Sequence, residues 1–372
     1  MEQLILGTTK ELDDYLISTG KKKILLVCDQ AISFLSLDAY FRDLPSRLGL
    51  SVIRFSDFEP NPRYESVEKG VAVFNKEQCD LIIAVGGGSG MDVAKCIKLY
   101  AFLDPTVSYL KQTIVPNDIP FIAVPTTAGT GSEATRYAVI YAHGEKQSIT
   151  HESVIPEAVL LDPSVLTTLP EYQRKSTMLD ALCHAVESTW SVHSTDESQE
   201  YSLSAIRQIL QYKDAYLANR PDGNQGMLLA ANQAGKAINI TQTTAGHAMC
   251  YKLTSLYHIA HGHAAALCVS RLFPYMLDHL EDCIDPRGVG HLEKSFEKIA
   301  AAFGAGSPKE AAVLFDGIVD SLGLAVPVPA EEDWEILSHS VNPVRLKNHP
   351  IRLGEGEIDR LYHQILSGKK EK

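Results

Sequence analysis

Residues 80–99 read DLIIAVGGGSGMDVAKCIKL, and this stretch decides the fold of the first half of the chain. An apolar run ends in three consecutive glycines and is followed by a segment with helical spacing. A buried strand, a glycine turn and a helix, in that order, are typical of a phosphate-binding α/β unit. The glycines allow the backbone to approach a pyrophosphate, whose charge the helix start attracts. The spacing is not Gly-x-Gly-x-x-Gly, so the pattern alone fits a plain glycine-rich turn equally well.

Strand-like and helix-like segments alternate on both sides of this stretch. The strand candidates are residues 23–28, 51–55, 80–85, 121–124 and 159–161, and the helix candidates are residues 63–77 and 91–103. Such alternation predicts a parallel sheet covered by helices. Ser89 and Asp92 fit a Ser-x-x-Asp capping box, which predicts that they start the helix after the glycines.

After Pro170 the pattern becomes helical throughout. Helices are predicted over residues 173–192, 197–218, 223–241, 291–303 and 308–322. We therefore predict a Rossmann-like α/β domain over residues 1–165 and an all-α domain over residues 166–372.

Composition excludes several classes of function. The 372 residues carry a formal net charge of −12, which disfavours nucleic acids and anionic membranes as partners. No uncharged apolar run reaches the roughly 18 residues that a membrane span needs. The seven cysteines form no Cys-x-x-Cys pair, so we expect reduced thiols and a cytoplasmic location.

A second loop rich in glycine and hydroxyl groups follows the strand at 121–124. It reads PTTAGTGSE over residues 125–133, and its hydroxyls can donate to phosphate or ribose oxygens. Two such loops on neighbouring strands would form one crevice. Asp29 follows the first strand, where a carboxylate accepts from a ribose 2′-OH and repels a 2′-phosphate. Asp29 alone fits a turn residue, and with the two loops it favours NAD over NADP.

A set of metal-type side chains lies in the helical half. Asp180 and His184 are four residues apart and share a helix face. His247 and His261 would be roughly 21 Å apart on one straight helix, so joint ligation requires a turn near residues 257–260. Three imidazoles and a carboxylate suit Zn²⁺ or Fe²⁺. The alternative is that these are separate polar residues on helix faces.

Taken together, these motifs resemble the iron-containing (group III) alcohol dehydrogenase family over essentially the whole chain. The resemblance rests on Gly86–Ser89 with Asp92 and Lys95, the 125–133 loop, Asp162-Pro163, the DALCHAVE stretch at 180–187, and His247 with His261-Gly262. It implies that residues 1–165 form the nucleotide-binding domain and that residues 166–372 form the metal-binding and substrate domain. NAD(H) and one divalent metal, Fe²⁺ or Zn²⁺, are expected in a cleft between them. The implied metal ligands are Asp180, His184, His247 and His261. The implied cofactor-binding residues are Asp29, Asn61, Gly87, Gly88, Ser89, Thr126, Thr127, Thr130 and Lys146. A small aldehyde or alcohol is the expected substrate, and a homo-oligomer, a dimer, is the expected assembly.

One position departs from the family pattern. Where the family usually has a histidine for proton relay, one turn after the third ligand, this chain has Tyr251. Tyr251 is therefore the candidate catalytic residue, as a proton donor or as a packing wall. We expect His263 to pack rather than bind metal, His258 to lie in a surface loop, and Cys183 and Cys250 to lie in the core.

A narrower resemblance is to the hydroxyethylphosphonate dehydrogenase branch, also called phosphonoacetaldehyde reductases. It rests on residues 245–257, on HGHA at 261–264 and on RLKN at 345–348. A phosphonate entering an acidic protein needs local cations; the candidates are Lys252, Arg345, Lys347 and Arg352. Two alternatives stay open at this point: a lyase that uses NAD and a metal like dehydroquinate synthase, and a non-catalytic nucleotide- or metal-binding homologue.

Overall fold

The computed structural model describes residues 3–367, which divide into two compact units. The first unit comprises the chain up to Leu169 together with Asn219–Leu228. The second comprises Pro170–Ala218 and the chain from Leu229 onward. Helix α7 (Pro221–Thr241) begins in the first unit and ends in the second.

A parallel six-stranded sheet forms the centre of the first unit, with strand order β1-β8-β5-β4-β2-β3. The strands are β1 (Leu4–Leu6), β2 (Lys23–Cys28), β3 (Ser51–Phe55), β4 (Leu81–Gly86), β5 (Phe121–Pro125) and β8 (Ala158–Leu160). Every residue of β4 and β5 is buried, as expected for central strands covered on both faces. The predicted strands are confirmed, with their ends shifted by one residue at most.

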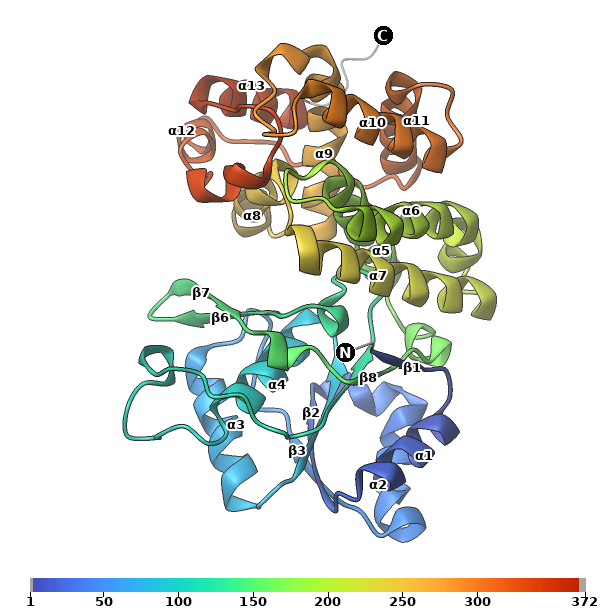
Figure 1. Cartoon of the computed structure of the whole chain (residues 1–372), viewed down its shortest axis with the longest axis vertical. Helices are drawn as coiled ribbons and strands as arrows, with labels where there is room; N and C mark the ends of the chain where they lie inside the picture. The colour runs from blue at the N-terminus through green and yellow to red at the C-terminus, as the bar shows by residue number, and fades with distance from the viewer. Residues whose placement is uncertain (1–2, 368–372) are drawn as a thin grey trace. The chain divides into compact units, whose positions relative to one another are not determined.

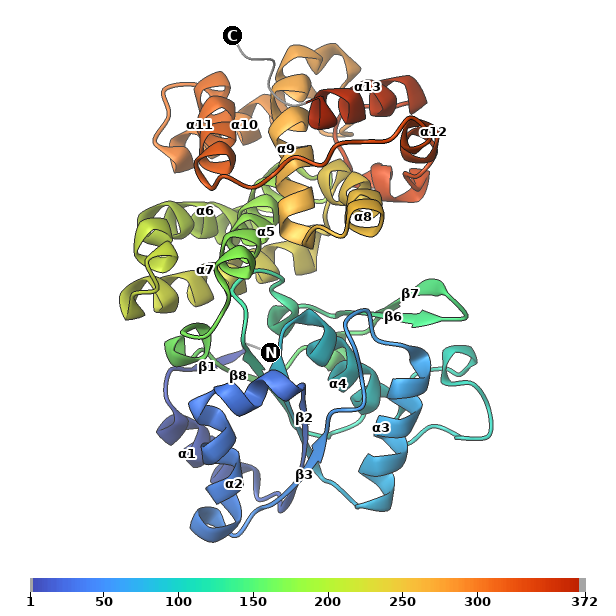
Figure 2. The same cartoon turned by 180° about the vertical axis from the view of Figure 1, so that it is seen from behind.

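Helices cover both faces of this sheet. Figures 1 and 2 show α1 (Thr9–Thr19) and α2 (Ser36–Leu48) on one face, and α3 (Tyr64–Lys76) and α4 (Gly88–Tyr100) on the other. Strands β3 and β4 lie on opposite sides of β2, so the winding direction reverses between β2 and β4. The ends of β2 and β4 therefore form the switch point at which open α/β sheets bind ligands.

Two features of this unit were missed from the sequence. The three-residue β1 is too short to give a periodic signal. The antiparallel hairpin of β6 (Tyr137–Ala142) and β7 (Glu145–Thr150) had a signal, because buried and half-exposed residues alternate along β6. Its two-residue turn places His143 at φ 54° and Gly144 at φ 80°, a conformation that glycine adopts without strain.

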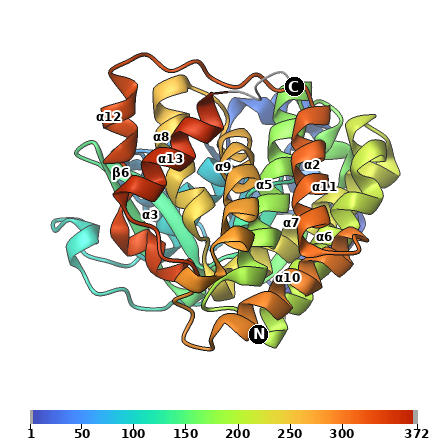
Figure 3. The ribbon, with the colours of Figure 1, turned by 90° about the horizontal axis from the view of Figure 1, so that it is seen from above.

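The second unit is helical, which confirms the predicted combination of an α/β and an all-α part. Its helices are α5 (Glu171–Trp190), α6 (Asp196–Leu217), α8 (Ala245–Tyr257), α9 (His261–Asp278), α10 (Val289–Phe303), α11 (Pro308–Ser321), α12 (Asp333–Ser338) and α13 (Glu355–Leu366). Figure 3 shows α5 and α9 side by side, and they are among the most extensively packed pairs of the unit. Short 3₁₀ segments join the elements: η1 (Gln30–Phe34), η2 (Tyr109–Lys111), η3 (Ser132–Ala134), η4 (Glu152–Val154), η5 (Pro163–Leu166), η6 (Leu280–Asp282) and η7 (Pro343–Asn348).

Candidate metal centre and nucleotide site

Three of the four predicted metal ligands meet in the second unit. Asp180 lies on α5, His247 on α8 and His261 at the start of α9, and one ligand atom from each lies within 4.8 Å of the others. They meet because the chain turns between α8 and α9, where His258 adopts a left-handed conformation with φ 54°. The predicted turn at residues 257–260 is therefore confirmed.

A glycine allows α9 to begin against α5. A Cβ atom at Gly262 would lie 2.1 Å from the Ser176 carbonyl oxygen and 2.8 Å from the Asp180 backbone nitrogen. Neither backbone atom can move without shifting α5, so a side chain here would push His261 away from Asp180. The absence of a side chain at Gly262 therefore permits the close approach of α9 to α5.

The buried atoms of the cluster fit a metal ion. Asp180 Oδ1 and His247 Nε2 lie 3.5 Å apart, and neither has a hydrogen-bond partner among the described residues. Buried polar atoms without partners are costly, and a cation between them would bind both. A carboxylate oxygen and imidazole nitrogens are donors that suit Fe²⁺ or Zn²⁺. Burial opposes ionisation of Asp180, but the neighbouring imidazoles His184 and His247 hold its pKa well below the ordinary value.

His184 lies beside the cluster. Its ring stacks on that of His247, with centroids 4.4 Å apart and an interplanar angle of 14°. In the part of the chain that the structure describes, the group of converging ligand atoms does not include His184. Its role as the fourth ligand stays a prediction.

Glu187 supports His247 from behind, a role that the sequence analysis did not assign. Its Oε2 contacts His247 Nδ1, while Oε1 accepts from the Thr244 hydroxyl at 2.6 Å and the Thr244 amide at 3.1 Å. The carboxylate is fully buried; burial raises its pKa, but His247 outweighs this and lowers the pKa to about 2. An imidazole that donates through Nδ1 presents an Nε2 lone pair to a metal. The available signal was spacing, since Glu187 lies seven residues after Asp180 on the same helix face.

Tyr251 lies next to this cluster, one turn after His247. The centroid of the Tyr251 ring lies 5.2 Å from that of His261. The Arg345 guanidinium lies 4.5 Å from the centre of the same Tyr251 ring. Burial raises the pKa of Tyr251 to about 12, against the opposing charge of Arg345. The phenol is therefore protonated at neutral pH and is a candidate proton donor.

Among the described residues, His263, His258 and the two flanking cysteines do not belong to the group of converging ligand atoms. His263 is buried, and its Nδ1 lies 3.2 Å from the Tyr172 hydroxyl rather than in the metal cluster. His258 is exposed at the end of α8, and Cys183 and Cys250 are buried. All seven cysteines are free thiols.

The two glycine-rich loops of the first unit lie together, as predicted. Strands β4 and β5 pair up to Gly86 and Pro125, and the Thr126 amide donates to the Gly86 carbonyl at 3.0 Å. A Cβ atom at Gly88 would lie 3.5 Å from the Thr130 side chain, and one at Gly87 would lie 3.5 Å from Thr127.

The predicted capping box at the start of α4 is wrong. The helix begins at Gly88 with Gly87 as its N-cap, and no side chain caps it. Asp92 instead accepts from the Ser132 hydroxyl at 3.3 Å, because α4 packs against the loop after β5. The first amides of α4 therefore keep their hydrogen-bonding capacity for an anion, which favours the phosphate site.

Asp29, Asn61 and Lys146, three further predicted cofactor residues, lie on separate segments of the first unit. Asp29 Oδ1 caps η1 through the Ala31 amide at 2.8 Å, and its Oδ2 lies 3.9 Å from a Cβ built on Gly86. Asn61, at φ 58°, lines a polar cavity of about 770 Å³ with Gln30 and Tyr141. Lys146 lies on β7; burial raises the pKa of Asp92 to about 6, against the opposing charges of Lys95 and Lys146. Contact of these residues with a nucleotide stays a prediction.

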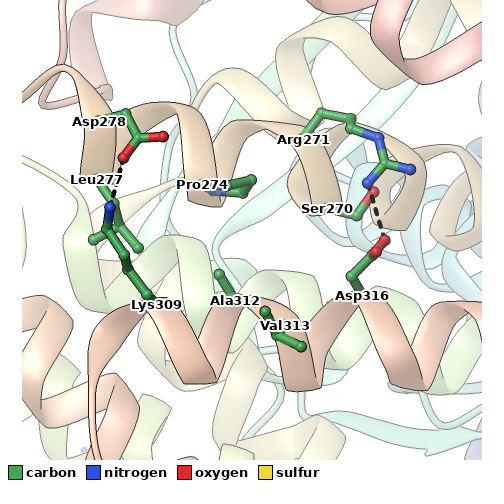
Figure 4. A pocket seen from close by; sticks show the side chains of 9 residues that line it. All are labelled: Ser270, Arg271, Pro274, Leu277, Asp278, Lys309, Ala312, Val313 and Asp316. Carbon is green, nitrogen blue, oxygen red and sulfur yellow. Dashed lines mark hydrogen bonds and ion pairs between the residues drawn. The ribbon is translucent and has the colours of Figure 1, made fainter. Parts of the chain in front are cut away.

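A second hollow lies apart from these residues, between α9 and α11. Figure 4 shows that its charged side chains pair with one another: Arg271 with Asp316 and Lys309 with Asp278, both at 3.0 Å. Its volume is about 250 Å³, and its lining includes none of the metal-type residues. We assign it no role in catalysis.

Glycine-rich loops at the switch point of a parallel sheet and a buried carboxylate–histidine cluster on a helical unit are features that suit an enzyme with a nucleotide and a metal ion. The family described as iron-containing alcohol dehydrogenase matches residues 4–163, and the C-terminal part of the Fe-containing alcohol dehydrogenase family matches residues 175–322. The chain belongs to the iron-containing alcohol dehydrogenase family. It is therefore an enzyme of the alcohol dehydrogenase class, which argues against the lyase and the non-catalytic alternatives.

Relatives and solved structures support this assignment. A phosphonoacetaldehyde reductase of Streptomyces viridochromogenes is 34% identical over 76% of this chain and 75% of its own length. Long-chain-alcohol dehydrogenase 1 of Geobacillus thermodenitrificans is 30% identical over 94% of this chain and 91% of its own. A sulfoacetaldehyde reductase from Bifidobacterium kashiwanohense, solved with NAD⁺, superposes with a TM-score of 0.87 at 25% identity, covering 99% of this chain and 98% of its own. Within residues 3–367, none of the helices is both long and apolar enough to cross a membrane.

Proposed function

We propose that this chain is an NAD(H)- and metal-dependent reductase that interconverts phosphonoacetaldehyde and 2-hydroxyethylphosphonate. The observation that carries the proposal is its similarity to reductases of phosphonoacetaldehyde and of sulfoacetaldehyde. Both names denote a two-carbon aldehyde with a tetrahedral oxyanion at the far end. A substrate of that class is small and anionic, and it requires a local cation in a chain with net charge −12.

The geometry of the second unit supports the chemistry. When bound, NADH supplies the hydride, and a divalent ion supplies a Lewis acid for the aldehyde oxygen. Asp180, His247 and His261 would hold that ion, with His184 as the expected fourth ligand. Glu187 keeps His247 in the tautomer that presents Nε2 to the cluster. The Tyr251 hydroxyl or water provides the proton that the reduced oxygen takes up.

The first unit would hold the dinucleotide. The uncapped amides at the start of α4, with Gly87 and Gly88 beside Thr127 and Thr130, support a pyrophosphate position. Asp29 lies next to this cradle and favours a free ribose 2′-OH, and hence NAD(H) over NADP(H). Asn61, Ser89, Thr126 and Lys146 complete the proposed set.

The test uses protein purified without oxygen, with its metal content measured before the assay. NADH absorbance is followed with phosphonoacetaldehyde, sulfoacetaldehyde, acetaldehyde and a sugar phosphate. We expect kcat/KM for phosphonoacetaldehyde to exceed that for acetaldehyde by about tenfold or more, the effect of one charge-assisted contact. Equal values for the two aldehydes would refute the proposed substrate. Turnover of the sugar phosphate alone would refute the reductase itself.

A further inference from the structure

We propose that Arg345 binds the oxyanion headgroup of the substrate, and that the Tyr251 ring holds its guanidinium beside the metal cluster. This inference rests on the proposed function for its substrate class. A chain with a net charge of −12 does not attract an anion as a whole, so a local cation must bind the headgroup, and Arg345 is the residue proposed for this. The ligand class is a phosphonate or sulfonate carried two carbons from an aldehyde.

The Arg345 guanidinium lies close to the metal cluster, with the Tyr251 ring between them. Segment η7 packs against α8, and the Arg345 guanidinium lies 4.5 Å from the centre of the Tyr251 ring. That ring lies 5.2 Å from the ring of His261, whose ligand atom converges with those of Asp180 and His247. Arg345 thus contacts Tyr251, and Tyr251 in turn contacts a residue of the cluster that would hold the aldehyde end of the substrate. A two-carbon substrate is short, so its headgroup cation must lie this near.

The positive charge of Arg345 is not balanced by a neighbouring carboxylate among the described residues. Arg345 is half-buried, and among residues 3–367 no carboxylate lies within ion-pair distance of it. The half-buried Arg271 differs, since it pairs with Asp316 at 3.0 Å. A partly desolvated guanidinium without a counter-ion attracts an anion strongly. Its planar fork matches two oxygens of a phosphonate or sulfonate.

Hydrogen bonds at both ends of η7 fix the position of this segment in the absence of substrate. Asn342 caps η7 by accepting from the Val344 amide at 2.9 Å. At the other end, the buried Asn348 donates to Gln242 Oε1 at 2.8 Å and to the Thr243 carbonyl at 3.3 Å. Arg345 therefore projects from a fixed backbone, which lowers the entropic cost of binding the headgroup.

The other candidate cations fit less well. Lys347 and Arg352 are exposed, and the structure records no contact between either side chain and the residues of the metal cluster. Lys252 follows Tyr251 directly on α8, so its side chain leaves the helix about 100° away from that of Tyr251. Arg345 is the member of this set that contacts an aromatic ring next to a metal-type histidine.

The experiment compares wild-type enzyme with Arg345→Met, Arg345→Lys and the matched control Arg360→Met, all loaded with metal. Arg360 is an exposed arginine of α13 in the same unit. Two quantities are measured for each protein. One is the ratio of kcat/KM for phosphonoacetaldehyde to that for propionaldehyde, an uncharged substrate. The other is the inhibition constant of ethylphosphonate against propionaldehyde.

We expect Arg345→Met to lower the kcat/KM ratio about 10- to 100-fold, mostly through KM, and to weaken ethylphosphonate inhibition in parallel. Arg345→Lys should retain part of the preference for phosphonoacetaldehyde and part of the ethylphosphonate inhibition, because lysine keeps the positive charge but lacks the planar pair of N–H donors of a guanidinium. Arg360→Met should match wild type. Equal losses with both aldehydes, or unchanged inhibition by ethylphosphonate, would overturn the assignment and leave Arg345 as a packing residue of Tyr251. The proposed function fails separately, if the wild-type ratio shows no preference for phosphonoacetaldehyde.

Discussion

Replacing Glu187 by glutamine should weaken metal binding while leaving the fold intact. In the structure, Glu187 Oε1 accepts from the Thr244 hydroxyl at 2.6 Å and from the Thr244 amide at 3.1 Å. The His247 amide also lies 3.4 Å from this atom. Three donors around one oxygen determine the orientation of a glutamine, whose carbonyl must take this position. Its NH₂ group then faces His247 Nδ1.

The loss of metal affinity can be estimated from this exchange, in which an amide N–H group replaces a carboxylate oxygen opposite His247 Nδ1. With an N–H group facing it, Nδ1 must accept, so the imidazole proton moves to Nε2 and occupies the lone pair that a metal needs. Metal binding would restore the original tautomer and leave two N–H groups opposed, at a cost of about 1–3 kcal/mol. Such a cost corresponds to a roughly 10- to 100-fold loss of metal affinity, the range typical of lost partners behind metal-ligating histidines.

The assay is chelator competition for Zn²⁺ or Fe²⁺, with the metal bound per chain measured by mass spectrometry. Glu171→Gln is the matched control, because Glu171 lies in the exposed first turn of the same helix and pairs with the neighbouring Lys175. The thermal midpoint of the metal-free variant should stay close to that of wild type. An affinity for Glu187→Gln within about twofold of wild type would refute the reasoning, since it would mean that the tautomer of His247 does not depend on Glu187.

Four further predictions concern other residues. Asp180→Ala and His261→Ala should each abolish turnover yet leave NADH binding, measured by fluorescence titration, nearly intact; near-normal activity after chelation and metal-free dialysis would contradict the metal assignment. Asp29→Gly should relax the preference for NAD(H), compared through kcat/KM with both cofactors, because the like charge facing a 2′-phosphate is gone; equal use of both by the unmodified enzyme would count against this role. Tyr251→Phe should keep most of kcat and Tyr251→Ala should lose it, because the ring supports His261 and Arg345; a drop of about 10²–10⁴-fold for Tyr251→Phe would instead identify the phenol as general acid. His349 is fully buried, and burial lowers its pKa to about 4 against the opposing charge of Glu187. Below about pH 6.5 the unfolded chain binds a proton that the folded chain does not, so the free energy of unfolding falls by up to about 3 kcal/mol toward pH 4. Urea unfolding of chelated protein at several pH values should show a smaller fall for His349→Leu, and the same pH dependence in both proteins would exclude this cause.

Much of the fold could be predicted because its signals are local. The apolar runs at 23–28 and 121–124 are strands, and the three glycines after Val85 form the junction of β4 and α4. A helix displays its own face with a period of 3.6 residues, so the neighbourhood of Asp180 and His184 was readable from spacing. Short β1 and the β6–β7 hairpin escaped because three residues carry no period, and because the alternation along β6 was not recognised.

What only the tertiary structure decided is which distant residues meet. His247 and His261 converge on Asp180 because α8 ends at a left-handed residue and because Gly262 lets α9 contact α5. Arg345 reaches Tyr251 across 94 positions of sequence, and Glu187 reaches His247 across 60. Such contacts depend on how whole helices pack, which is determined by side chains along their entire length. No local pattern encodes that packing, so the sequence by itself supplied the candidate ligands, while the fold selected their partners.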